Sequence, residues 1–161
     1  MIQRPATPDD FAAILALNEE SVHFLSPLSR ERLELLHRSA ELHEVVEIEG
    51  EVIAFVLALR EGASYDSVNY RWFAQRFEPF LYVDRVVVSN AHRSAGAGRL
   101  LYEKVFAHAA ATGVPRVTCE YDLSPPNPAS ERFHASFGFA EVGRQLVAGG
   151  KKMVSLQAAR A

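Results

Sequence analysis

The sequence predicts an α/β fold in which about seven strands form one mixed sheet, accompanied by four helices. The main indication is a β-rich run at 80–88, a helix-compatible segment at 96–111 and a second β-rich run at 114–121. A strand, helix and strand in this order form a βαβ unit with parallel strands. Pairs of shorter strands joined by glycine-containing turns precede and follow this unit, so the other strands are expected to be antiparallel. The 161 residues suit a single domain over 1–161.

The first part of the chain predicts one short strand and two helices. A strand is expected over 2–6. Thr7 is a suitable N-cap with Pro8 at the first helical position, so a helix should follow. A second helix is expected to begin at the cap Ser29 and to end near His37.

A hairpin and a long connection come next. The β-rich runs 43–48 and 51–59 are separated by Glu49-Gly50, which is typical of a tight turn between antiparallel strands. Residues 61–78 are polar and aromatic, and we expect them to form an irregular connection to the central strand. Long connections in compact domains are often functional.

The central helix and the C-terminal part complete the predicted fold. Leu101, Val105 and Ala109 form an apolar i, i+4 stripe on the central helix. After the strand 114–121, a short helix is expected at 129–136. Two last strands, at 141–146 and 152–156, should form another hairpin; Ala148, Gly149 and Gly150 lie in their connection.

Composition limits the functional classes. The net charge is −3 and the chain has no dense Lys/Arg cluster, so we expect no nucleic-acid partner. The single cysteine, Cys119, excludes an internal disulfide, and no apolar run approaches the ~20 residues that a membrane helix needs. The six histidines show no paired metal spacing. We therefore expect a cytoplasmic protein, a monomer or homodimer, without metal and without a membrane partner.

The loop between the central strand and helix is the clearest candidate binding site. The stretch His92-Arg93-Ser94-Ala95-Gly96-Ala97-Gly98-Arg99 carries little side-chain bulk and opens a helix, whose first amides have no intrahelical partner. Phosphate binds well there. A Walker loop would need Lys after Gly98, where Arg99 stands. A Rossmann loop would need a third glycine at Leu101, although Glu120 lies near the position of a ribose-binding acid. The Rossmann interpretation is weakened and remains open.

Two segments together resemble the GNAT superfamily of N-acetyltransferases. Arg93-x-x-Gly96-x-Gly98 is similar to its pyrophosphate motif, and 127–139 is similar to its Asn-x-x-Ala/Ser-x-x-Phe/Leu-Tyr segment, in the expected order. The resemblance implies a GNAT-like fold and acetyl-CoA as cosubstrate, with the pyrophosphate on the amides of about 94–99. The residues that it assigns to acetyl-CoA are Val86, Val88, Arg93, Ser94, Ala95, Gly96, Ala97, Gly98, Arg99, Asn127, Ser130, Phe133 and His134.

The catalytic candidates are His134, Glu120 and Asp84. His134 stands where the superfamily often has its tyrosine acid, so it could protonate the leaving thiolate. The alternatives are that His134 only lines the pantetheine channel, or that Tyr121 or Tyr102 supplies a phenol. Glu120 and Asp84 interrupt apolar strands and are candidate bases, because an unpaired buried charge is costly. The alternative for Asp84 is an ion pair with Arg85.

The acceptor is expected to be the primary amine of a small molecule, amino acids included. Aromatic residues between 65 and 82 could form a pocket wall, with Arg71 and Arg76 for a carboxylate; a buried flap or dimer contact is the alternative. A protein or peptide N-acetyltransferase and a non-catalytic acyl-CoA-binding module remain open as other functions.

Overall fold

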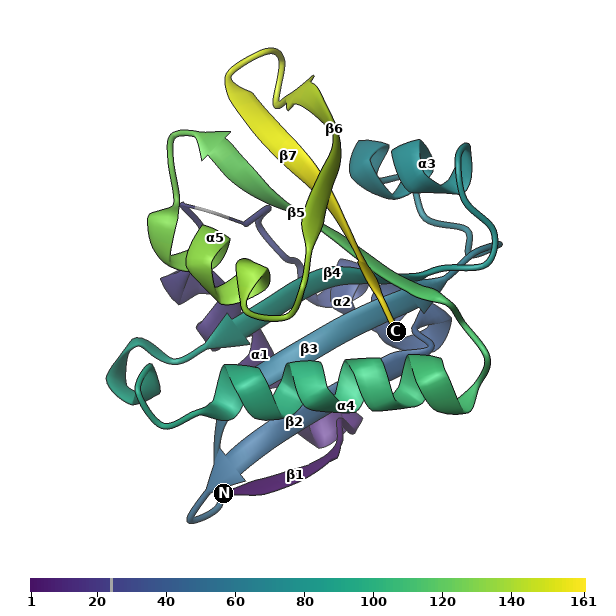
Figure 1. Cartoon of the computed structure of the whole chain (residues 1–161). Helices are drawn as coiled ribbons and strands as arrows, with labels where there is room; N and C mark the ends of the chain where they lie inside the picture. Colours follow the sequence, from purple (N-terminus) through teal and green to yellow (C-terminus); the bar gives the residue numbers. More distant parts are fainter. Residues whose placement is uncertain (24) are drawn as a thin grey trace. The chain divides into compact units, whose positions relative to one another are not determined.

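The computed structural model describes residues 1–23 and 25–161, and these residues contain seven strands and five α-helices (Figure 1). The strands are β1 (Ile2–Pro5), β2 (Leu42–Ile48), β3 (Glu51–Arg60), β4 (Leu81–Val88), β5 (Arg116–Ser124), β6 (Ala140–Val147) and β7 (Lys152–Arg160). The α-helices are α1 (Phe11–Glu20), α2 (Arg30–Ser39), α3 (Val68–Ala74), α4 (Ala97–Ala111) and α5 (Pro128–Ala135).

The strands form one mixed sheet in the order β1-β2-β3-β4-β5-β7-β6. The β4/β5 pair is parallel, with Leu81 opposite Val117 and Tyr82 opposite Thr118. The pairs β1/β2, β2/β3, β5/β7 and β6/β7 are antiparallel. The predicted mixed sheet with a central βαβ unit is therefore confirmed. In the described parts of the chain, no helix combines the length and the apolar composition needed to cross a membrane.

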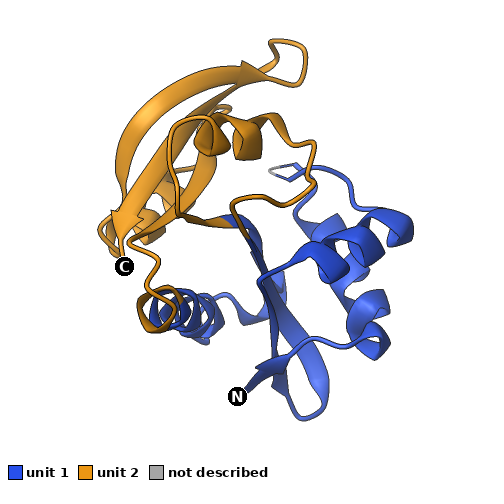
Figure 2. Ribbon diagram, turned by 90° about the vertical axis from the view of Figure 1, so that its right-hand side faces the viewer, with its two compact units in different colours: residues 1–59, 83–108 blue, residues 60–82, 109–161 orange. Residues whose placement is uncertain are grey.

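The chain divides into two compact units, which Figure 2 colours separately. Unit 1 consists of residues 1–59 and 83–108, and unit 2 of residues 60–82 and 109–161. The prediction of a single domain over 1–161 stays a prediction.

Unit 1 is built around the long strand β3. Side chains 53–59 of this strand are all fully buried. The turn Glu49-Gly50 has positive φ at both residues (50° and 81°), as a primed hairpin turn requires. The hydroxyl of Ser29 accepts the amide of Arg32 at 3.1 Å, which confirms the predicted cap of α2. The sequence signals for the hairpin and for this cap thus led to the correct local structure.

Unit 2 contains a helix that the sequence did not predict. α3 lies within the connection 61–78 and is capped by the Ser67 hydroxyl, which accepts the Tyr70 amide at 3.3 Å. Figure 1 shows α3 beside β6, and the two elements are joined by a hydrogen bond from Gln145 Nε2 to Asn69 Oδ1 at 2.7 Å. Trp72 packs on Gly143 of β6, where an added Cβ would overlap with the indole ring. The helix is thus part of the packed structure of the unit.

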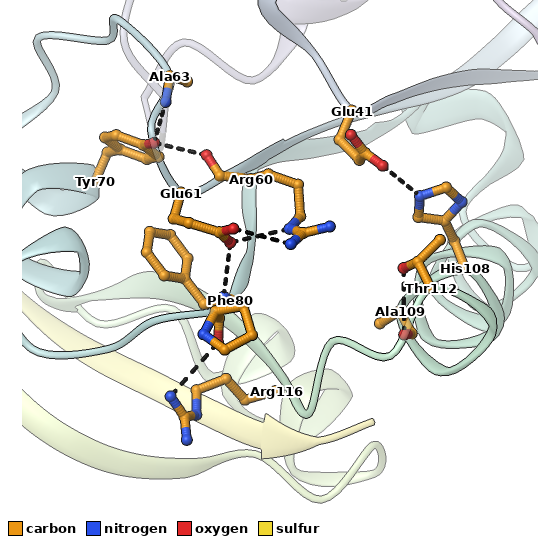
Figure 3. A network of polar contacts seen from close by, with 11 residues as sticks. Glu41, Arg60, Glu61, Ala63, Tyr70, Phe80, His108, Ala109, Thr112 and Arg116 are labelled. Atoms are coloured by element: carbon orange, nitrogen blue, oxygen red, sulfur yellow. Dashed lines mark hydrogen bonds and ion pairs between the residues drawn. The ribbon is translucent and has the colours of Figure 1, made fainter.

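Polar contacts fix both ends of this connection (Figure 3). Glu61 forms an ion pair with Arg60 at 2.9 Å and accepts the amide of Phe80 at 3.1 Å. The phenol of Tyr70 donates to the carbonyl of Arg60 at 2.6 Å and accepts the amide of Ala63 at 3.0 Å. Four aromatic side chains of this region are at most 2% exposed: Tyr70, Phe73, Phe80 and Tyr82. They form a core, which supports the buried flap rather than the predicted pocket wall.

Candidate functional site: a helix N-terminus in unit 1 and a polar network in unit 2

The loop after β4 leads directly into the N-terminus of α4, in unit 1. Gly96 has a φ of 86°, and open space surrounds the position of its missing Cβ. The amide of Leu100 bonds to the Gly96 carbonyl at 3.1 Å, so α4 begins at Ala97. The amides of Ala97, Gly98 and Arg99 therefore precede the first intrahelical N–H donor, Leu100, and carry the positive end of the helix dipole. This is a suitable site for an anion such as a pyrophosphate.

The other residues between 86 and 99 that are assigned to acetyl-CoA also belong to unit 1. Arg93 is exposed, and its guanidinium is held by Asn90 Oδ1 at 2.8 and 3.0 Å. Ser94 and Ala95 are exposed as well. In β4, the half-buried Val86 and Val88 alternate with buried residues and so share one face of the strand with Asp84.

Asp84 is engaged in a buried ion pair. Its carboxylate accepts from the Arg85 Nε at 2.6 Å, and each side chain is 4% exposed. Arg85 also donates to Asn18 Oδ1 at 3.0 Å and to the Ser26 carbonyl at 3.3 Å. A buried pair of this kind loses much stability when one partner is removed. The contact supports the structural interpretation of Asp84, and its role as a base stays a prediction.

In unit 2, the segment 127–134 forms the first turns of α5. Asn127 Oδ1 accepts the Ser130 amide at 3.4 Å, and Pro128 occupies the first helical position. This places Asn127 at the N-cap of α5, where its carboxamide oxygen is used and its carboxamide nitrogen can donate to a ligand. Asn127, Ser130, Phe133 and His134 are therefore brought together on one short helix.

His134 is buried and its tautomer is fixed by its own helix. Its side chain lies with Nδ1 2.7 Å from the Ser130 carbonyl oxygen and 3.2 Å from the Ser130 hydroxyl. Because a carbonyl oxygen only accepts hydrogen bonds, Nδ1 carries the proton. In the neutral ring Nε2 is then unprotonated. Burial lowers the pKa of His134, which favours this neutral form. A neutral His134 has no proton to give from Nε2, so the predicted role as acid is poorly supported.

Glu120 is held by a tyrosine of the neighbouring strand. The Tyr82 hydroxyl donates to Glu120 Oε1 at 2.5 Å, a short distance typical of a hydroxyl bonded to a carboxylate. Tyr82 is 1% exposed, whereas Glu120 is half-buried. The half-buried carboxylate is thus oriented by a rigid donor.

A polar network around Tyr121 was missed at the sequence level. Gln157 Nε2 donates to the Tyr121 hydroxyl at 3.1 Å and to the Ser155 hydroxyl at 2.6 Å. Ser155 in turn donates to Glu141 Oε2 at 2.6 Å. A sequence signal for this network was available. Polar Ser155 and Gln157 alternate with apolar residues in β7, and residues 154–157 of this strand are all buried. Only the phenol of Tyr121 had been considered, as an alternative acid.

The predicted arginine contacts for a carboxylate are not supported. The guanidinium of Arg76 stacks on the Trp72 ring, 3.9 Å from its centroid, and donates to the Trp72 carbonyl at 2.9 Å. Arg71 is exposed on α3. Within the described residues, no group of three or more His, Cys, Asp or Glu side chains is arranged to hold a metal ion.

Comparison with known proteins identifies the relatives of this chain. Residues 10–139 match the sequence profile of the acetyltransferase (GNAT) family. No curated protein sequence gives a significant match.

Solved structures resemble the chain over nearly its whole length. Ard1 from Thermoplasma volcanium has a TM-score of 0.82 and 14% identity, covering 99% of this chain and 97% of that one. The ribosomal-protein-S18-alanine N-acetyltransferase from Escherichia coli has a TM-score of 0.73 and 16% identity, with 99% and 92% covered. The protein yncA from Salmonella typhimurium, solved with its cofactor acetyl-CoA, has a TM-score of 0.75 and 20% identity, with 99% and 93% covered. At these identities the likeness shows a shared fold.

Proposed function

Because the chain belongs to the GNAT acetyltransferase family and transfers an acetyl group from acetyl-CoA, we propose that its acceptor is the primary amine of a small molecule, amino acids included. The amine attacks the thioester directly, without an acyl-enzyme intermediate. The observation that carries the cofactor part of this proposal is the N-terminus of α4 with the Gly96 turn before it.

The residues of unit 1 fit a pyrophosphate. The amides of Ala97, Gly98 and Arg99 point away from the helix, and no atom lies within 4 Å of the Cβ position at Gly96. A negatively charged diphosphate is stabilised there by the helix dipole and by the amides together. Acetyl-CoA supplies the activated acetyl group when it is bound.

Glu120 is the better-supported base of the two carboxylates. A lysine-like amine has a pKa of ~10.4 and arrives as an ammonium ion, so it must lose a proton before it can attack. Asp84 is paired with the cation Arg85 at 2.6 Å, whereas Glu120 accepts a hydrogen bond from the neutral phenol of Tyr82. We assign the removal of the ammonium proton to Glu120.

A second candidate acceptor is the N-terminal amine of a polypeptide. The fold matches a structure named as a ribosomal-protein-S18-alanine N-acetyltransferase, with 99% of this chain covered. An α-amino group has a pKa of ~7.7–8.0 and loses its proton more easily than a lysine side chain. Acetylation of such an acceptor should therefore be less affected by Glu120→Gln, and this difference distinguishes the two candidates experimentally.

The test is a panel of amines with acetyl-CoA, followed by detection of the released thiol. The panel contains free amino acids, polyamines and peptides with different N-terminal residues. We expect turnover with small amines and a loss of about 10²-fold in kcat for Glu120→Gln, the usual scale for a lost general base. Glu103→Gln, at an exposed carboxylate of α4, is the control and should be as active as the wild type. Far better turnover with peptides than with any small amine would overturn the proposed acceptor.

A further inference from the structure

The departing thiolate needs a proton donor, and the structure argues against His134 in that role. Nδ1 of His134 is committed to the Ser130 carbonyl at 2.7 Å, and the ring is 5% exposed. Donation from Nε2 would require a buried imidazolium, which burial disfavours. A different group with a dissociable proton must therefore be sought near this ring.

Tyr121 of β5 is the neighbouring candidate. Its ring packs against the His134 ring at a centroid distance of 5.7 Å and an interplanar angle of 43°. The side chain of Tyr121 is half-buried, whereas that of His134 is buried. Burial, and next the charge of Glu131, raise the pKa of the Tyr121 phenol, so that the phenol is protonated at neutral pH.

The network behind Tyr121 fixes the direction of its hydrogen bonds. Glu141 accepts the only proton of the Ser155 hydroxyl at 2.6 Å, and this bond is the main reason for the lowered pKa of Glu141. The Ser155 oxygen can then only accept, so the Gln157 carboxamide must turn its NH₂ group toward it, at 2.6 Å.

The second proton of that NH₂ group reaches the Tyr121 oxygen at 3.1 Å. The phenol thus receives a hydrogen bond from Gln157 through its oxygen, and this bond does not use the phenol's own proton. Ser155 and Gln157 are 0% and 3% exposed, so solvent does not compete for these bonds. A donor that points at the phenol oxygen also stabilises the phenolate that remains after proton transfer.

We propose that Tyr121, held by Gln157 and packed on His134, is the general acid that protonates the CoA thiolate. The inference rests on the proposed function and adds a residue to it. As the amine nitrogen forms its bond to the acetyl carbon, the carbon–sulfur bond breaks and its electron pair goes to sulfur. The Tyr121 proton then forms the S–H bond of CoA, and the phenolate regains a proton from the second proton released by the amine. His134 acts on the ring of Tyr121 as a positioning residue.

The experiment compares Tyr121→Phe with Tyr102→Phe in single-turnover and steady-state assays of thiol release. Tyr121→Phe keeps the ring that packs on His134 and removes only the hydroxyl. Tyr102 is a fully buried tyrosine of α4, and its variant controls for the loss of a phenol in the core. Thermal unfolding of all three proteins shows whether each variant is folded.

We expect Tyr121→Phe to lower kcat by about 10²-fold or more, with a change of less than about threefold in the KM for acetyl-CoA. Tyr102→Phe should keep the kcat of the wild type. If the wild type turns over and Tyr121→Phe has the same single-turnover rate, the assignment of Tyr121 is wrong while the proposed function stands. If the wild type releases no thiol with any amine of the panel, the proposed function fails and the inference fails with it.

Discussion

Individual residues in this protein can act only through the atoms that their neighbours leave available. His134 has its Nδ1 bound to the Ser130 carbonyl, and Asp84 has a carboxylate oxygen bound to Arg85. Tyr121 differs, because its oxygen accepts from Gln157 and its proton is not needed for that bond. Three residues that look suited to chemistry in the sequence thus differ in which of their atoms the neighbouring groups engage.

Gly96 gives the first prediction at this scale. A β-branched residue at a φ of 86° is strained even though the space around it is open, so Gly96→Val should deform the turn before α4. The amides of Ala97 to Arg99 would then no longer converge on a pyrophosphate. We expect CoA affinity, measured by isothermal titration calorimetry, to fall at least about tenfold, which corresponds to ~1.4 kcal/mol.

Gly113, which follows the other end of α4, supplies a matched control. It also has a positive φ (73°) and no atom within 4 Å of its Cβ position. Gly113→Val should lose a similar amount of stability as Gly96→Val, about 1–2 kcal/mol for one left-handed residue, and should bind CoA like the wild type. Equal CoA affinity in both variants would place the pyrophosphate elsewhere.

At the scale of elements, specific local signals in the sequence were sufficient to predict the local structure. The Glu49-Gly50 turn, the Ser29 cap and the strand, loop and helix of the central unit all appear as predicted. α3 could not be predicted, because its seven residues are rich in aromatic and β-branched side chains with low helix propensity. Its stability comes from contacts with β6, which no local pattern shows.

The same reason explains what was missed in the candidate site. The motif residues of the loop and of α5 are local in sequence, and the structure places them on the expected elements. The bonds of Tyr121 with Gln157 and of Tyr82 with Glu120 join residues 36 and 38 positions apart. Such pairs depend on strand register, which a single sequence does not fix.

The contact of α3 with β6 gives a prediction at the element scale. A methyl group at Gly143 would overlap with the Trp72 indole, so Gly143→Ala should displace the ring and lower the free energy of unfolding by about 1–3 kcal/mol. Trp72 is the single tryptophan of the chain, so its fluorescence reports on this contact directly. Urea titration followed by fluorescence measures both effects.

Leu146→Ala is the control for that experiment. Leu146 lies in the same strand and is 59% exposed, so its truncation should change the free energy of unfolding by less than about 0.5 kcal/mol. If Gly143→Ala matched this control in stability and in emission spectrum, α3 would not be anchored on β6 as described.

At the scale of the whole molecule, the contact of the buried His43 with the half-buried His37 links stability to pH. His43 Nδ1 lies 2.8 Å from His37 Nδ1, and burial, followed by the charge on His37, lowers the pKa of His43 to about 4, while Asp10 opposes this shift. The folded state therefore favours neutral His43. Its contribution is complete above the unfolded pKa of ~6.5 and is lost as the pH falls from there toward 4.

We expect the free energy of unfolding of the wild type to decrease by roughly 3 kcal/mol over this interval because of His43, with a further decrease from His134, whose pKa is also lowered. His43→Phe should flatten the dependence between pH 7 and pH 5, whereas His23→Gln, at an exposed histidine, should not. Urea unfolding at the two pH values tests this. If His43→Phe and the wild type lost the same free energy of unfolding between pH 7 and pH 5, the assignment of this pH dependence to His43 would be wrong.

The aromatic connection between β3 and β4 also limits how the sequence can diverge. Tyr70, Phe73 and Phe80 are at most 2% exposed, so replacing any of them with a smaller residue leaves a cavity in the interior of unit 2. In a randomised library covering residues 61–80, selection for soluble protein would remove most members, and the survivors would keep aromatic residues at 70, 73 and 80. Enzymes with new acceptor preferences should therefore be sought by varying other loops, because this segment has little freedom to evolve.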